Sequence, residues 1–283
     1  MHFDLHIHSW HSKQKIVPFD GLDSPEILIK TAITKGFSGI AITDHDTLKG
    51  FFEAKKYCKD NGIKEFILIP GIETSTAKGH IVGLGIEEEI PVGLSPEEAI
   101  DLIHKAGGIA IAAHPFDVAR KGVGKLVTNL DFDAIEILNG HNADRISNIR
   151  ARKAADKLKK IKLVGSDAHM AEEIGFSMTN IEDVETVDDV LKKIKKGEIT
   201  ISGKTIPVSL IKKLGINRLR KSYEAVSVYV EKNYYTPKRQ VARILLSTLN
   251  HNSKMIDILY TGFTVVSWVS VFTISSLRYI LSA

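Results

Sequence analysis

The chain has 283 residues, with 38 Lys and Arg against 34 Asp and Glu, 43% hydrophobic residues and a single cysteine. This length and apolar content suffice for a large buried core and exclude a disordered chain. One cysteine excludes an internal disulfide and any zinc site built on two or more thiolates. The first residues, MHFDLHIH, lack a basic stretch followed by an apolar one, so no signal peptide is predicted and a cytoplasmic location is expected.

The net charge of +4 divides the chain into three parts. Residues 1–207 carry a net charge of −4, residues 208–254 carry +8, and residues 255–283 sum to zero. We therefore predict a globular domain over 1–207, a basic helical collar over 208–254, and an apolar C-terminal segment over 255–283.

Short apolar runs alternate with helix-like stretches over the first 207 residues. Strands are predicted at 3–7, 39–43, 66–72, 81–86, 109–113, 134–138 and 163–165, and helices at 25–36, 48–61, 96–106, 143–160 and 187–196. Ser24-Pro25-Glu26 and Ser95-Pro96-Glu97 are typical helix starts. Continuous apolar strands separated by helices indicate a parallel sheet covered on both faces, and seven such units favour a closed α/β barrel.

Histidines and acids gather where these strands end. They are His6 and His8 at the end of the first strand, Asp44, His45 and Asp46 after the second, Glu73 at the end of the third, His114 after the fifth, and Asp167 and His169 after the seventh. The carboxyl ends of parallel strands share one mouth of a barrel, so we expect these side chains to converge. His80 precedes its strand, and a loop is expected to bring it back to the mouth.

Imidazole and carboxylate groups together suit Zn, Mn or Fe, whereas Mg prefers an all-oxygen shell. The two histidines of His6-Ile7-His8 share one face of their strand, because side chains on a strand alternate. The sequence therefore predicts a buried centre for divalent metal ions.

Six motifs carry a resemblance to a known family. They are Asp4-Leu5-His6-Ile7-His8-Ser9, Thr43-Asp44-His45-Asp46, Gly71-Ile72-Glu73, Gly79-His80-Ile81-Val82-Gly83-Leu84-Gly85, Ala113-His114-Pro115 and Gly165-Ser166-Asp167-Ala168-His169. In this order they resemble the PHP (polymerase and histidinol phosphatase) family of metal-dependent phosphoesterases. The resemblance implies a distorted, TIM-like (β/α)7 barrel that holds two or three metal ions.

The resemblance also implies a set of ligands. His6, His8, Glu73 and Asp167 would hold the first metal, Glu73 would bridge to a second held by His80 and His114, and His45 with His169 would hold a third. The family usually has an Asp or His shortly after H-x-H, but this chain has Ser12 and Lys13 there. His11 and Asp20 are the candidate replacements, and without one of them the third site would be weak or empty.

Phosphoester hydrolysis is the activity predicted from these features. Two divalent ions would let a bridging hydroxide attack phosphorus, and the chain has neither a phosphate-binding P-loop nor a Gly-x-Ser-x-Gly elbow. The favoured substrate is a nucleotide or short nucleic acid. The alternatives are a small-metabolite phosphatase such as a histidinol-phosphatase, and a non-catalytic binding or regulatory module.

Further roles are assigned to polar residues near the predicted mouth. The leaving group would be protonated by His45, Asp46 or His169, which are the candidates for acid–base catalysis. Arg120, Lys121, Asn139 and His141 are the candidates for substrate contact, against the alternative that they are ordinary polar loop residues.

The C-terminal part allows several interpretations. Residues 258–277 carry no charge and favour a membrane-spanning helix that anchors the protein; a helix buried on the barrel or in a dimer interface, or a strand, are the alternatives. The cations of the collar have three possible roles. They would flank a membrane span, bind single-stranded nucleic acid together with interleaved tyrosines, or simply form a solvated face. They are Lys212, Lys213, Arg218, Arg220, Lys221, Lys238, Arg239 and Arg243, and the tyrosines are Tyr223, Tyr229, Tyr234 and Tyr235. The sequence predicts no oligomeric state.

Overall fold

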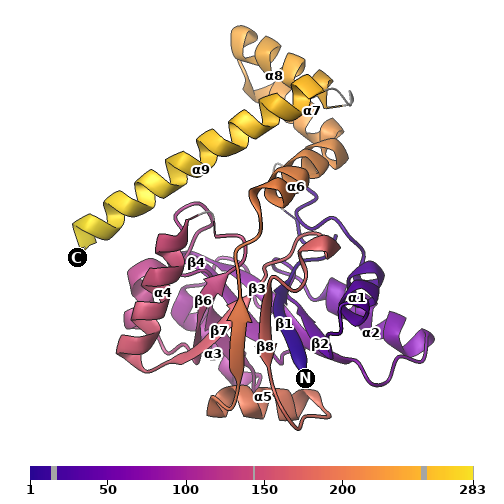
Figure 1. The fold of residues 1–283 in the computed structure, drawn as a ribbon, viewed down its shortest axis with the longest axis vertical. Helices are drawn as coiled ribbons and strands as arrows, with labels where there is room; N and C mark the ends of the chain where they lie inside the picture. The colour runs from indigo at the N-terminus through magenta and orange to yellow at the C-terminus, as the bar shows by residue number, and fades with distance from the viewer. Residues whose placement is uncertain (14–17, 143, 250–253, 283) are drawn as a thin grey trace.

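The structure is a computed structural model that describes residues 1–13, 18–142, 144–249 and 254–282. Residue 143 of a predicted helix, residues 250–253 of the predicted collar and Ala283 of the predicted tail lie outside the described residues. A curved sheet with helices around it forms the body of the molecule, and four further helices extend from one end of it (Figure 1).

The sheet has nine strands within the described residues, in the spatial order β7-β6-β5-β4-β3-β2-β1-β8-β9. Beyond its hydrogen-bonded neighbours, β1 also lies beside β7, and a parallel bridge joins Ile7 to Ala168, so the sheet is a nearly closed barrel. This confirms the predicted barrel fold. The strands are β1 (His2–Ile7), β2 (Gly39–Ile42), β3 (Ile67–Thr76), β4 (Gly79–Leu84), β5 (Ile109–Ala112), β6 (Ala134–Asn139), β7 (Ile161–Gly165), β8 (Ser177–Asn180) and β9 (Thr200–Gly203).

The expectation of a wholly parallel sheet is wrong at β4, and also at β8 and β9, which pair antiparallel with β1 and with each other. Strand β4 pairs antiparallel with both β3 and β5, while β1–β2–β3 and β5–β6–β7 are parallel. A tight turn from Thr76 to Gly79 joins β3 to β4, and His80 pairs with Ser75 in the ladder. Because β4 runs backwards, its first residues lie at the end where its neighbours finish. His80 therefore reaches the mouth without the loop that we expected.

Helices cover the outside of the barrel close to the predicted positions. They are α1 (Pro25–Thr34), α2 (Lys49–Asp60), α3 (Pro96–Lys105), α4 (Arg145–Leu158) and α5 (Val187–Lys196), with short 3-10 helices η1 (Gly124–Thr128) and η2 (Ala171–Glu173). Ser24 and Ser95 cap α1 and α3 as predicted: the Ser24 hydroxyl accepts from Ile27 N–H, and Ser95 forms a capping box with Glu98.

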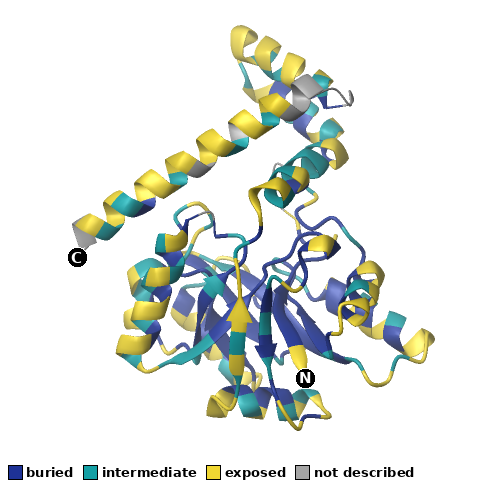
Figure 2. Ribbon diagram, in the orientation of Figure 1, coloured by how far each residue is buried: buried dark blue, intermediate teal, exposed yellow. Residues whose placement is uncertain are grey.

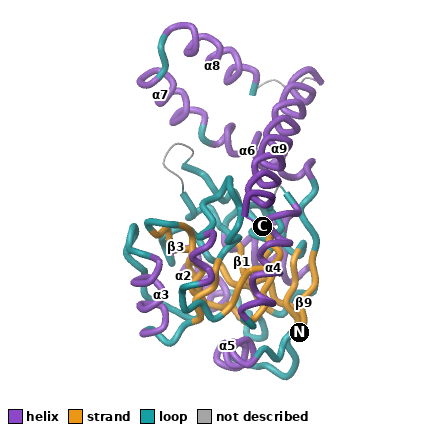
Figure 3. Tube along the Cα trace, turned by 90° about the vertical axis from the view of Figure 1, so that its left-hand side faces the viewer, coloured by secondary structure: helices purple, strands orange, loops and turns teal. Residues whose placement is uncertain are grey.

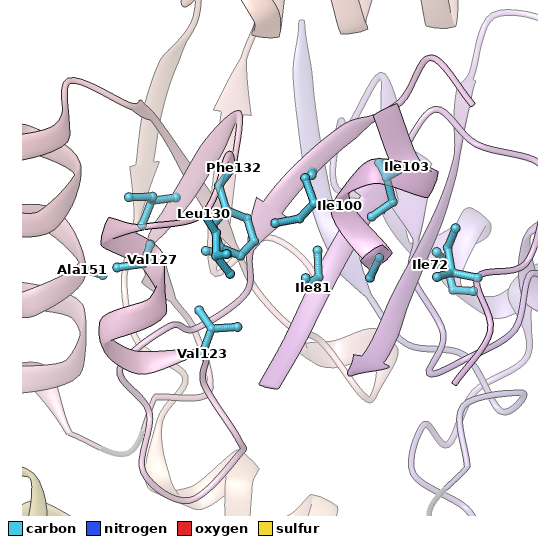
Figure 4. Packing of buried hydrophobic residues seen from close by; sticks show 14 of the residues in the cluster. Ile72, Ile81, Ile100, Ile103, Val123, Val127, Leu130, Phe132 and Ala151 are labelled. Carbon is cyan, nitrogen blue, oxygen red and sulfur yellow. The ribbon is translucent and has the colours of Figure 1, made fainter. Parts of the chain in front are cut away.

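The core has one layer outside the sheet and one inside it. Figure 4 shows the outer layer, where Ile100 and Ile103 of α3 pack with Ile81 of β4 and with Phe132. Inside the barrel, Leu5, Val82, Ile111 and Leu163 line a small apolar space beneath His6 and Glu136. Strands β1 to β6 are accordingly buried along most of their length, whereas the edge strand β9 is mostly exposed (Figure 2). This packing gives the mouth a rigid floor.

The C-terminal extension consists of α6 (Val208–Lys221), α7 (Tyr223–Asn233), α8 (Thr236–Thr248) and α9 (Lys254–Ser282). In Figures 1 and 3, α6 stands above the barrel, α7 and α8 lie farther out, and the long α9 runs back past α6 toward α4. Val226, Val230, Leu246 and Leu249 form a small core of their own within the extension. The apolar tail is thus a helix and not a strand.

Candidate metal centre

Two histidines from the end of β1 form the first group of the site. His6 and His8 are buried, and their Nε2 atoms lie 3.2 Å apart. The Nε2 atom of His8 is 3.2 Å from Glu73 Oε2 and 3.1 Å from Asp167 Oδ1, and that of His6 is 3.5 and 3.6 Å from the same two oxygens. The structure therefore brings together the four residues expected around a first metal ion.

Glu73 connects this group to a second one. Its Oε2 atom faces His6 and His8, while its Oε1 atom lies 2.9 Å from His114 Nε2 and 3.2 Å from His80 Nδ1. Glu73 reaches this place near the end of the parallel run of β3, and His80 reaches it from the start of the antiparallel β4. The two carboxylate oxygens are divided between two sets of imidazoles, which is the arrangement that a bridging ligand needs.

A third group lies on the other side of His8. The Oδ2 atom of Asp20 is 3.1 Å from His169 Nε2 and 3.4 Å from His45 Nε2. His11 instead faces Glu53 of α2, with Nε2 and Oε2 2.5 Å apart. Of the two candidate replacements, the geometry thus brings Asp20 to the cluster, while His11 is paired elsewhere.

The donor atoms fit divalent metal ions. Three of the described ligand groups each bring together imidazole and carboxylate atoms within 4.8 Å: His6, His8 and Asp167; His8, Asp20 and His169; and Glu73, His80 and His114. The buried Nδ1 atoms of His45 and His80 have no hydrogen-bond partner among the described residues, although each lies 3.2 Å from a Glu73 oxygen. Buried imidazole nitrogens without a hydrogen-bond partner, beside a carboxylate oxygen, are donor atoms available to a divalent metal ion.

A buried acid that sequence reasoning missed, Glu136, supports these ligands from behind. Glu136 of β6 lies 2.9 Å from His6 Nδ1 and accepts a hydrogen bond from the backbone of His114. Asp44, which belongs to a recognised motif, accepts two hydrogen bonds from Ser9 instead of facing the cluster. A charged residue in the apolar run of β6 was the only signal for Glu136. Such partners orient metal ligands and fix their tautomers.

Charge coupling within the cluster shifts several pKa values in the metal-free protein. Burial opposes ionisation, yet the neighbouring histidines and, for Asp167, Arg120 hold the pKa of Glu73 and Asp167 well below the usual range. Burial likewise disfavours charge on His8, but Asp167 and Glu73 outweigh it and raise the pKa of His8 to about 9. Burial dominates at the third group, where the pKa of His45 falls to about 4 and that of His169 to about 3.

A cavity of about 820 Å³ opens above the cluster. Its walls include Glu73, His80, His114 and Asp167, and four cations stand around it, namely Lys13, Arg120, Lys121 and Arg218. Asp46 also lines the cavity, with its Oδ1 atom accepting a hydrogen bond from Ser75 N–H at 2.6 Å.

The four candidates for substrate contact all lie at or beside this cavity. Arg120, Lys121 and His141 line it, and Asn139 accepts a hydrogen bond from Arg120 at 2.8 Å. Arg120 also contacts Asp117 and Asp167, so it is held in place by the same acid that faces His8. His141 Nε2 lies 3.1 Å from Glu173, a buried acid that sequence reasoning missed.

Comparisons with known proteins agree with this geometry. A family model described as PHP-associated matches residues 145–199. An uncharacterized protein of Methanocaldococcus jannaschii is 41% identical over 152 residues, which cover 52% of this chain and 87% of that protein. The chain belongs to the PHP family. The chain is accordingly a phosphoric ester hydrolase of this family.

This PHP protein is also similar to an enzyme of known name and to a solved structure. A 5'-3' exoribonuclease of Haemophilus influenzae is 40% identical over 93 residues, which cover 31% of this chain and 30% of that protein. A crystal structure of a two-domain protein from Bacteroides vulgatus, described as containing a predicted PHP-like metal-dependent phosphoesterase, shares the fold with a TM-score of 0.59 and 17% identity. That likeness covers 72% of this chain and 65% of the other.

Proposed function

We propose that this PHP protein hydrolyses a phosphoester bond of a nucleotide or short nucleic acid at the cluster around Glu73. The observation that carries the proposal is the division of the Glu73 carboxylate, whose Oε2 atom faces His6 and His8 while Oε1 faces His80 and His114. Divalent ions held there would neutralise charge on the phosphoryl oxygens and make water a stronger nucleophile. The proposed ligands are His6, His8, His45, Glu73, His80, His114, Asp167 and His169, with Asp20.

The remaining side chains of the cavity then take simpler roles. Because burial keeps the pKa of His45 and His169 low, both imidazoles are neutral near pH 7, which suits metal ligation better than proton donation. Asp46 lines the cavity outside the ligand groups and is the remaining candidate to carry the leaving-group proton. Arg120 and Lys121 offer positive charge to a phosphate that enters the cavity.

A nucleotide or nucleic acid is favoured over a small metabolite by the cavity itself. It is large, at about 820 Å³, and Lys13 and Lys121 at its wall, which are not among the cations paired within the described residues, would bind more phosphate than the one being cleaved. The exoribonuclease similarity points the same way. The collar adds little, because each of its eight named cations has a partner within the chain. A histidinol-phosphatase-like activity is the second candidate.

Metal-dependent hydrolysis by the full-length protein tests this proposal. The purified chain would be assayed with Mn²⁺ or Zn²⁺ on mononucleotides, short oligonucleotides and metabolite phosphoesters. We expect His8→Ala and Asp167→Asn to abolish turnover with an unchanged circular dichroism spectrum. His104→Ala is the matched control, because His104 faces Asp133 on the outside of the barrel. Full activity in either ligand variant would refute the site assignment. A metal-free and inert wild type would refute the proposed activity and favour a non-catalytic module.

We also propose that α9 anchors the protein to a membrane. Ile258–Ile280 has a mean hydropathy of 1.6, and only 6% of its apolar window is buried. The hydroxyls of Thr264, Ser270, Thr273 and Ser276 each donate to the carbonyl four residues earlier, so their hydrogen bonds would persist in lipid. In the structure, α9 contacts α4 and its capping residue through Tyr279–Lys153 and Ser275–Asp144, and α6 through Thr261–Lys212. These few polar contacts would be given up on insertion.

Extraction from cell membranes tests the anchor. A spanning helix keeps the full-length protein in the membrane pellet after a carbonate wash and releases it only with detergent. Release by carbonate alone would contradict the anchor and favour a helix that packs on the barrel or in a dimer.

A further inference from the structure

The first helix of the extension is docked onto the two loops that carry Asp20 and His169 of the third ligand group. Leu214 of α6 is buried against Leu22 and Met170, which follow Asp20 and His169 in their loops. Lys221 donates to the Leu22 carbonyl at 2.5 Å, and Lys213 pairs with Glu172. Helix α6 of the extension therefore contacts both the loop after β1 and the loop after β7 and holds them next to each other.

One residue of α6 reaches past this contact to the cavity. Arg218 Nε donates to the backbone carbonyl of Asp20 at 2.6 Å, and its Nη2 atom lies 2.7 Å from Asp20 Oδ1. Arg218 thus donates a hydrogen bond to the backbone of Asp20 and forms an ion pair with its side chain. It is also one of the four cations that line the cavity.

The two oxygens of Asp20 face in different directions. Oδ1 is paired with Arg218, whereas Oδ2 faces His169, His45 and the hydroxyl of Ser12. Asp20 is almost fully buried, and a buried carboxylate that is held on one side only would be free to rotate away from the cluster. The Arg218 contact fixes the rotation that leaves Oδ2 available to a cation.

We propose that Arg218 is a positioning residue: from the C-terminal extension, it holds Asp20 in place as a ligand of the third metal site. This inference rests on the proposed function and deepens it. It makes α6 part of the catalytic unit, so that the functional domain ends near Lys221 and not before the collar. The extension then has a role at the active site that is separate from any role of α9 in anchoring.

Metal binding by the full-length protein tests this role without relying on turnover. Wild type, Arg218→Ala and Arg218→Gln would be titrated with Mn²⁺, and bound metal would be counted by mass spectrometry after dialysis. We expect both variants to bind the last ion about 10- to 100-fold more weakly, which is the usual effect of losing an outer partner, and to keep the tighter ions. Arg220→Ala is the matched control, since Arg220 donates to Leu249 within the extension.

A double-mutant comparison separates positioning from a general loss of structure. If Arg218 acts through Asp20, adding Arg218→Ala to Asp20→Asn produces no further loss of the last ion. Additive losses, or a wild-type affinity for the last ion in Arg218→Gln, would overturn the inference. A wild type that binds two ions but never a third would overturn it as well and leave the proposed function intact. A wild type that binds no ion would instead refute the proposed function.

Discussion

Glu136 shows how much a single buried acid can contribute behind the ligands. It contacts His6 Nδ1, the backbone of His114 and the amide of Asn139, so it links the proposed first and second metal groups. Glu136→Gln replaces one acceptor oxygen with a donor, which then faces a group that also donates. We expect metal affinity to fall about 10- to 100-fold. Isothermal titration with Zn²⁺ or Mn²⁺ measures this, with the exposed Glu198→Gln as control; an unchanged affinity would show that Glu136 does not orient His6.

The coupling of His8 to its acids predicts how metal binding depends on pH. The pKa of His8 is raised to about 9 in the metal-free protein, so near pH 7 the imidazole carries a proton that a metal ion must displace. Apparent affinity should therefore rise as pH increases from 6 toward 9, and binding should release protons. Titrations in buffers of different ionisation enthalpy measure that release. A flat affinity over this range would contradict a protonated His8.

Sequence and structure agree best for residues that belong to contiguous motifs. His6, His8, Glu73, His114 and Asp167 could be placed because each follows or ends an apolar strand, and strand ends converge in any barrel of this kind. Asp20, Glu136 and Arg218 could not be placed with the same certainty. The position of Asp20 depends on the path of an irregular loop, that of Glu136 on which face of β6 points inward, and that of Arg218 on where α6 docks. No local sequence pattern indicates any of these three features.

At the scale of elements, the direction of β4 was the main error of prediction. An apolar run of residues does not indicate the direction of its strand. The turn at Thr76–Gly79 is too short to hold a crossover helix, so the short length of this turn was the available signal that β4 is antiparallel. The short polar strands β8 and β9 also lacked an apolar signal. Helices α1 and α3 were predicted more accurately because a serine cap and a proline mark each of their starts.

The loop after β1 leaves no room for a side chain at Gly21, next to Asp20. A Cβ atom there would lie 2.1 Å from the Ser9 carbonyl oxygen and 2.9 Å from that of His8, both of which are backbone atoms. We expect Gly21→Ala to lower the free energy of unfolding by about 1–3 kcal/mol and to weaken binding of the last metal ion, because the loop must shift. Urea denaturation and Mn²⁺ titration measure the two effects.

Gly215 of α6 provides the matched control for that substitution. A Cβ at this helical position meets nothing within 4 Å, so Gly215→Ala should be neutral or should stabilise the protein by up to about 1 kcal/mol. Equal effects of the two substitutions would contradict the tight packing of the loop after β1.

At the scale of the whole molecule, two truncations separate the proposed roles of the extension. Ending the chain after residue 249 removes α9 but keeps α6, Leu214 and Arg218 at the barrel mouth. This variant should leave the membrane fraction and bind as many metal ions as the full chain.

Ending the chain after residue 207 also removes α6 and exposes Leu22 and Met170. Each side chain that becomes fully exposed lowers the free energy of unfolding by about 1.5–3 kcal/mol, and this variant should lose the last metal ion. Fractionation, thermal melts and metal counting on both variants measure these outcomes. A shorter chain that melts like the longer one and keeps every ion would show that the barrel alone forms the catalytic unit and that α6 serves only as a connection to α9.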